Sequence, residues 1–246
     1  KSQGDKPAAA ILTQMVSQMD SSGVFEKTRC RWDAPDSLGF LKFDLEAPIA
    51  TWSTVPGPPS DLFSGVSLTD LLSHRSGIDS DPIAYRVAFT GDWSPELLWS
   101  LTRETRESDV PYGTFQYGNA GYNLATILID QRFRLDWREL VRDEVLNPIG
   151  MADTTGWLSE ARADGAVIAA GHLGHPADGP VRSPLQKVDA TMQSAGGLMS
   201  SANDMARWLE VQINDGVLDG RRVFPEGLVA STHRPLATSG GSFGPS

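Results

Sequence analysis

The sequence is poor in cysteine, in basic side chains and in long apolar runs. It contains a single cysteine, Cys30, so a disulfide within the chain and a cysteine-built metal site are both excluded. The 31 acidic side chains outnumber the 21 basic ones, and a net charge of −10 without a Lys/Arg cluster argues against nucleic acid as a partner. The longest apolar runs, such as residues 8–12, are far shorter than the roughly 18 residues that cross a bilayer. Residues 1–5 show no signal-peptide pattern, and the localisation stays open.

The remaining composition is that of a folded chain rich in helices. Hydrophobic residues make up 40% of the 246 positions, too many for a disordered chain. Capping residues and helical spacing predict helices over residues 7–19, 67–76, 94–101, 119–131, 136–147 and 201–215. The helix at 119–131 is apolar on almost every side and is therefore predicted to lie at the centre of the domain. Strand patterns are few; residues 166–170 form the best one, and residues 223–224 a weaker one.

The helix predicted after Ser201 has an apolar stripe. Its spacing predicts that Met205, Trp208 and Leu209 pack inward. The same spacing places Arg207 and Glu210 on the outer face.

Local motifs for chemistry are weak. None of the five lysines has a serine three residues before it, so the Ser-x-x-Lys pair of a nucleophile and its activating amine is absent. A Gly-x-Ser-x-Gly match at 240–244 has only two residues after it, whereas a nucleophile elbow needs a following helix. His172, His175 and Asp178 lie in a Gly/Pro-containing loop that is better explained as surface than as a metal site. Cys30 has no motif around it and is better explained as a structural thiol.

Four segments together carry a stronger signal, because they occur in the order and spacing of one family. Each is short, but they extend over residues 66–208: His-Arg-Ser-Gly within 66–78, Tyr-Gly-Asn within 115–122, Asn-Pro-Ile-Gly-Met within 146–154, and Ala-Gly-Gly-Leu-Met-Ser within 195–208. The chain thus resembles the serine β-lactamase-like family, which includes class C β-lactamases, D-Ala-D-Ala carboxypeptidases of the penicillin-binding type and related esterases.

The resemblance implies an α/β (α+β) fold in which a helix-rich domain lies against an antiparallel sheet, with the active site between them. It also implies a serine hydrolase that acts through an acyl-enzyme on a small lactam, amide (peptide) or ester substrate, without a metal or a cofactor. Tyr117 corresponds to the family's proton-shuttling tyrosine, and Asn119 to the residue that contacts substrate or positions the lysine. A phenol with a pKa near 10 needs a neighbouring cation to act as a base at neutral pH.

Two departures from the family pattern concern the nucleophile and the sheet. Lys6 aligns with the family lysine, but Gln3 stands where the serine is expected; Ser2 lies one residue further away and is the alternative nucleophile. No Lys or His is followed by Thr/Ser-Gly, the strand motif that borders the family's site. We therefore expect a single domain over residues 1–246 that lacks the first and last sheet strands and can self-associate through exposed sheet edges.

Three functions remain open from these observations. The chain is a serine hydrolase, a non-catalytic relative that binds a peptide, sugar-peptide or protein partner, or a structural fragment without activity. The motifs do not distinguish a lactam from a peptide or an ester, since variable loops build the pocket.

Overall fold

The computed structural model describes residues 46–51, 64–79, 97, 100, 105–133, 136–173, 179–184 and 187–237. Ser2, Lys6, Cys30 and the helix predicted at 7–19 lie outside these residues, as does most of the helix predicted at 94–101. The helices are α2 (Leu68–Leu72), α5 (Ala120–Phe133), α6 (Trp137–Val141), α7 (Asn147–Ile149), α8 (Leu158–Ala163), α9 (Ala202–Ile213) and α10 (Leu228–Thr232). Short helical turns cover Ile49–Thr51, Arg142–Leu146 and Asp189–Thr191.

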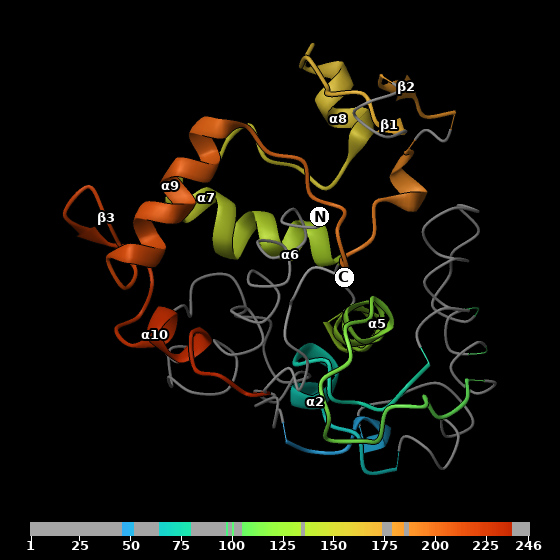
Figure 1. Cartoon of the computed structure of the whole chain (residues 1–246). Helices are drawn as coiled ribbons and strands as arrows, with labels where there is room; N and C mark the ends of the chain where they lie inside the picture. Colours follow the sequence, from blue (N-terminus) through green and yellow to red (C-terminus); the bar gives the residue numbers. More distant parts are fainter. Residues whose placement is uncertain are drawn as a thin grey trace.

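Helix α5 lies at the centre of the described structure, with α2 on one side and the continuous α6–α7 helix on another (Figure 1). Its residues from Ala120 to Leu128 are all buried, as their apolar composition predicts. The approach of α2 is close: a Cβ on Gly121 would overlap the carbonyl oxygen of Leu71. Only glycine allows the two helices to pack at this distance.

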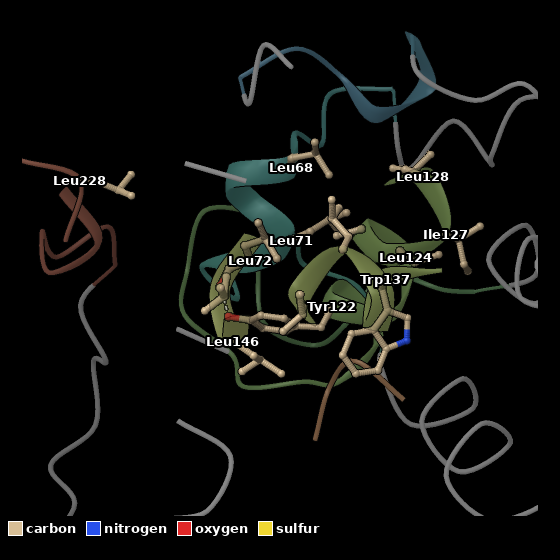
Figure 2. Packing of buried hydrophobic residues seen from close by; sticks show 14 of the residues in the cluster. Leu68, Leu71, Leu72, Tyr122, Leu124, Ile127, Leu128, Trp137, Leu146 and Leu228 are labelled. Carbon is tan, nitrogen blue, oxygen red and sulfur yellow. Dashed lines mark hydrogen bonds between the residues drawn. The ribbon is translucent and has the colours of Figure 1, made fainter. Parts of the chain in front are cut away.

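The core is formed where α2, α5 and α6 meet. Figure 2 shows Leu71 of α2 and Leu124 of α5 packed near Trp137 of α6, and all three side chains are at most 2% exposed. Side chains from α9 and from the segment that follows it, among them Trp208 and Phe224, belong to the same hydrophobic cluster. Helices α2, α5, α6, α7, α9 and α10 therefore share one core.

Helix α2 begins as the sequence predicts. Ser67 is its N-cap: its hydroxyl accepts a hydrogen bond from the Asp70 backbone N–H, and the Asp70 carboxylate accepts one from the Ser67 N–H. The predicted end at Gly77 is wrong, because the helix stops at Leu72 and His74 already has a left-handed φ of 60°. The chain turns there to meet the segment before α5.

The helix predicted from Asp136 also forms, and it continues slightly further than expected. Asp136 accepts a hydrogen bond from the Arg138 N–H, and the helix runs through a π-helical turn into α7. It ends at Gly150, whose φ of 71° suits a residue without a Cβ. Pro148 lies in the last turn of this helix rather than stopping it.

Helix α9 begins at its predicted cap, Ser201, but one residue of the predicted stripe is wrong. Trp208 is buried and Met205 packs against the core, whereas Leu209 is 56% exposed. Leu209 lies about 100° around the helix from Trp208, which turns it out of the interface. Arg207 is half-buried rather than outward, since its Nε donates to the Ile149 carbonyl at 2.6 Å.

The described strands form two antiparallel pairs, each of two-residue strands. Strand β1 (His172–Leu173) pairs with β2 (Val181–Arg182), and β3 (Val217–Leu218) with β4 (Arg221–Arg222). The strand predicted at 166–170 is wrong: this segment is exposed and belongs to none of the described strands. Residues 223–224 follow β4 instead of forming a strand, and Phe224 enters the core. None of the described helices is both long and apolar enough to span a membrane.

Candidate active site

Tyr117 and Asn119 lie in the segment directly before α5. The Tyr117 side chain is exposed, and its hydroxyl donates a hydrogen bond to Asn119 Oδ1 at 3.1 Å. The Asn119 carbonyl accepts the Asn123 N–H at 3.3 Å and so begins the helical bonding of α5. The Tyr-x-Asn motif therefore presents a phenol and an amide at the N-terminal end of the central helix.

His74, from the turn after α2, contacts this segment through its backbone and its ring. Its carbonyl accepts the Gln116 N–H at 2.8 Å, and its Nδ1 accepts the Gly118 N–H at 3.3 Å. The imidazole ring lies 4.8 Å from the Tyr117 ring, centroid to centroid. The His-Arg-Ser-Gly and Tyr-Gly-Asn motifs, more than 40 residues apart in the sequence, are thus in direct contact.

The His74 ring is partly withdrawn from water. Burial lowers the pKa of His74 below its usual value. An Nδ1 that accepts a hydrogen bond carries no proton, so the neutral ring has its hydrogen on Nε2. The sequence motif alone did not indicate a role for this histidine.

A second polar cluster surrounds Asp70 on the other side of this turn. Its carboxylate pairs with the Arg75 guanidinium at 3.1 Å and accepts the Tyr112 hydroxyl at 2.9 Å. The hydrogen bond to Asp70 raises the pKa of Tyr112, and burial and the carboxylate charge act in the same direction.

A cavity of about 260 Å³ lies beside Tyr112, lined also by Val66, Gly77 and Glu107 among others. Tyr117 and Asn119 do not line it.

Two other polar side chains near the family motifs have structural contacts. Ser194 precedes the Ala-Gly-Gly turn, but it is 1% exposed and its hydroxyl donates to the Tyr122 carbonyl at 3.2 Å. Lys187 donates its Nζ to the Thr191 carbonyl at 3.3 Å, and burial lowers the pKa of this amine. The lysine that the resemblance places beside Tyr117 is Lys6, which lies outside the described residues together with Ser2.

The loop weighed as a metal site is described only in part. His172 is exposed in β1, with Nδ1 2.9 Å from the Ala170 carbonyl oxygen; His175 and Asp178 lie outside the described residues. Within the part of the chain that the structure describes, no three His, Cys, Asp or Glu side chains are grouped to hold an ion.

The arrangement of helices has clear relatives among solved structures. A D-amino acid amidase from Ochrobactrum anthropi SV3 superimposes with a TM-score of 0.60 at 20% identity, covering 89% of this chain and 57% of that one. An octameric penicillin-binding protein homologue from Pyrococcus abyssi gives 0.63 at 21% identity, covering 91% and 46%. The fold is therefore that of the β-lactamases and transpeptidases, as predicted.

The family follows from the sequence match. The beta-lactamase family model matches residues 9–245, and the chain belongs to this family. The unguisins hydrolase ungD' of Aspergillus campestris is 31% identical over 153 residues, which is 59% of this chain and 27% of that protein. Penicillin-binding protein 4 of Amycolatopsis lactamdurans is 25% identical over 181 residues, 70% of this chain and 45% of its own length. The chain thus spans about a quarter to a half of these relatives.

Proposed function

We propose that this chain is a serine hydrolase that attacks the carbonyl carbon of a lactam, amide or ester. A serine Oγ bonds to that carbon, the serine proton passes through a base to the leaving amine or alcohol, and water then hydrolyses the acyl-enzyme. The observation that carries the proposal is the exposed Tyr117, hydrogen-bonded to the half-buried Asn119 at the start of the central helix. A relative named as a hydrolase supports the same reaction class.

Tyr117 has the role of the proton-transferring base in this proposal. Its phenol is 53% exposed and is held 3.1 Å from Asn119, so a substrate can reach both groups. A nearby cation must stabilise the phenolate for transfer at neutral pH, and Lys6 is the proposed source. Asn119 then binds the substrate or orients that lysine.

A second function, binding without catalysis, is favoured by the motifs that the sequence lacks. Without Ser-x-x-Lys, the nucleophile and its amine are not held on adjacent helical turns. In the family that the chain resembles, a Lys/His-Thr/Ser-Gly strand gives a donor to the oxyanion, and one such donor is worth about 10²–10³ in turnover; residues 1–246 do not contain this motif. We therefore predict slow or undetectable turnover of nitrocefin and p-nitrophenyl butyrate by this chain.

Covalent labelling tests the proposal independently of turnover. The full chain is incubated with a fluorescent penicillin or a fluorophosphonate and examined on a denaturing gel. We expect a labelled band that Tyr117→Phe weakens about tenfold or more, because the base is lost. Tyr112→Phe is the matched control, since it removes a phenol that is bonded to Asp70 rather than to Asn119.

The outcomes separate the two functions. Loss of the label in Ser2→Ala identifies the nucleophile, whereas a label that survives requires another serine. Absence of labelling by either probe contradicts the hydrolase and leaves the binding protein. Rapid nitrocefin turnover that disappears in Tyr117→Phe would instead contradict the predicted slow rate.

A further inference from the structure

We propose that His74 is a positioning residue, whose carbonyl, Nδ1 and ring hold the segment that presents Tyr117 and Asn119. This inference rests on the proposed function, because it assigns His74 to the machinery of that same site. His74 itself does not touch the reacting atoms in this proposal; it acts through Tyr117.

Three consecutive residues of the segment contact this one histidine. The Gln116 N–H donates to its carbonyl at 2.8 Å, the Gly118 N–H donates to its Nδ1 at 3.3 Å, and the ring of Tyr117, between them, lies 4.8 Å from the imidazole at 39°. Two hydrogen bonds on either side of Tyr117 restrict the backbone that carries it. The ring contact restricts the side chain itself.

The histidine is in turn anchored to the core. Its ring lies 5.3 Å from the ring of Tyr122, a buried residue of α5 whose hydroxyl donates to the Leu72 carbonyl at 2.8 Å. The ring of Phe115 lies 5.6 Å from the imidazole, centroid to centroid, in an edge-to-face arrangement. His74 thus joins the exposed segment to α2 and α5, two helices of the core.

The backbone of His74 is in an unfavourable conformation. A φ of 60° is uncommon for a residue with a side chain and persists where surrounding contacts outweigh its cost. Glycine or asparagine would adopt this φ more easily, yet neither offers an aromatic ring. The ring contacts with Tyr117 and Tyr122 are what histidine adds at this position.

The contact with Gly118 depends on protonation. Nδ1 accepts only when it carries no proton, and burial lowers the pKa of His74, so the bond is present at neutral pH. The groups facing the ring are the phenols of Tyr117 and Tyr122, while the guanidinium of neighbouring Arg75 is bonded to Asp70. As the pH falls below the ordinary histidine pKa near 6.5, protonation removes this acceptor, and the segment keeps the bond from the Gln116 N–H to the His74 carbonyl but loses the one from Gly118.

Two substitutions separate the hydrogen bond from the backbone conformation. His74→Asn keeps tolerance of the left-handed φ and offers a side-chain oxygen near the place of Nδ1. His74→Gly keeps only the backbone. His172→Asn is the control, because His172 is exposed in β1 and its Nδ1 lies beside the Ala170 carbonyl.

The first readout is the amide resonance of Gly118 in ¹H–¹⁵N NMR spectra of the full chain. We expect its chemical shift to follow the titration of His74, and to move in His74→Gly but much less in His74→Asn. Unchanged Gly118 and Tyr117 resonances in His74→Gly would overturn the proposal. If that variant fails to fold, the pH titration of the wild-type chain still tests the bond between the Gly118 N–H and His74 Nδ1.

The second readout is the rate of labelling by the fluorescent penicillin. We expect a fall of about tenfold or more in His74→Gly, about threefold or less in His74→Asn, and none in His172→Asn, since misplacing a reacting group costs rate steeply. Equal rates in the wild-type and His74→Gly proteins would overturn the proposal. Absence of labelling in the wild-type chain contradicts the proposed function instead, and the NMR experiment then decides whether His74 positions the segment.

Discussion

Helices α5 and α9 reach the same core by different means. Helix α5 is buried from Ala120 to Leu128, whereas α9 is buried only at Asp204, Trp208 and Val211. A helix that is apolar on almost every side is stable only in the interior, so its composition predicts the central position. A one-sided helix must also be rotated correctly, and an error of one residue exchanges a buried side chain for an exposed one.

The buried face of α9 contains a charged residue, which explains the mistake at Leu209. Asp204 is 4% exposed and accepts hydrogen bonds from the Asp153 N–H at 2.8 Å and the Thr154 hydroxyl at 2.7 Å. The true stripe follows positions 204, 208 and 211, which are four and three residues apart. A carboxylate on a buried face is exceptional unless it is hydrogen-bonded, as it is here.

The largest effect is expected for the aromatic residue that anchors α9. Trp208→Ala should lower the free energy of unfolding by about 3–5 kcal/mol, because it opens a cavity in the shared core. Chemical denaturation of the full chain measures the change. A loss below about 1 kcal/mol would show that α9 contributes little to the core, and would contradict the statement that α5 and α9 share it.

The next effect concerns the buried carboxylate of α9. Asp204→Ala should cost about 1–3 kcal/mol, since it leaves the Thr154 hydroxyl and the Asp153 N–H without their acceptor. Asp204→Asn is the matched control, because both bonds end on the same carboxylate oxygen, Oδ2, and an amide oxygen in its place can accept both. Equal thermal midpoints for Asp204→Ala and the wild type would mean that the carboxylate does not hold α9.

A smaller effect is expected at the polar end of α5. Tyr122→Phe removes the hydroxyl that donates to the Leu72 carbonyl and should cost about 1 kcal/mol, because that buried acceptor is left unpaired. The ring contact with His74 is retained, so labelling by penicillin should change less than in His74→Gly. A loss of several kcal/mol in a denaturant titration would assign a much larger role to this bond.

The smallest effect is expected at Leu209, which the helical spacing wrongly predicted to be buried. Leu209→Ala should change the free energy of unfolding by less than about 0.5 kcal/mol, because the side chain is 56% exposed and alanine favours the helix. The same denaturant titration compares it with Trp208→Ala. A cost of 2 kcal/mol or more would indicate that Leu209 is buried, as the helical spacing predicted.

The candidate site was predictable only in part. Tyr117 and Asn119 were found from a motif whose residues are two apart, and the helix after them was evident from its apolar run. His74 belongs to another motif more than 40 residues earlier, and no local pattern connects the two. The contact depends on a left-handed turn after α2, where the sequence predicted that the helix would continue.

Local chemistry therefore determined the caps at Ser67, Asp136 and Ser201, and apolar content determined the centre, because these depend on neighbours within one helical turn or on composition. Tertiary structure decided which distant residues form hydrogen bonds with one another. Arg138, in the first turn of α6, is buried, where it donates to the Gly156 carbonyl at 3.1 Å and to the Met192 carbonyl at 2.6 Å. A guanidinium reaches loops 18 and 54 residues away only once the chain has folded, and these long-range hydrogen bonds cannot be predicted from a local sequence pattern.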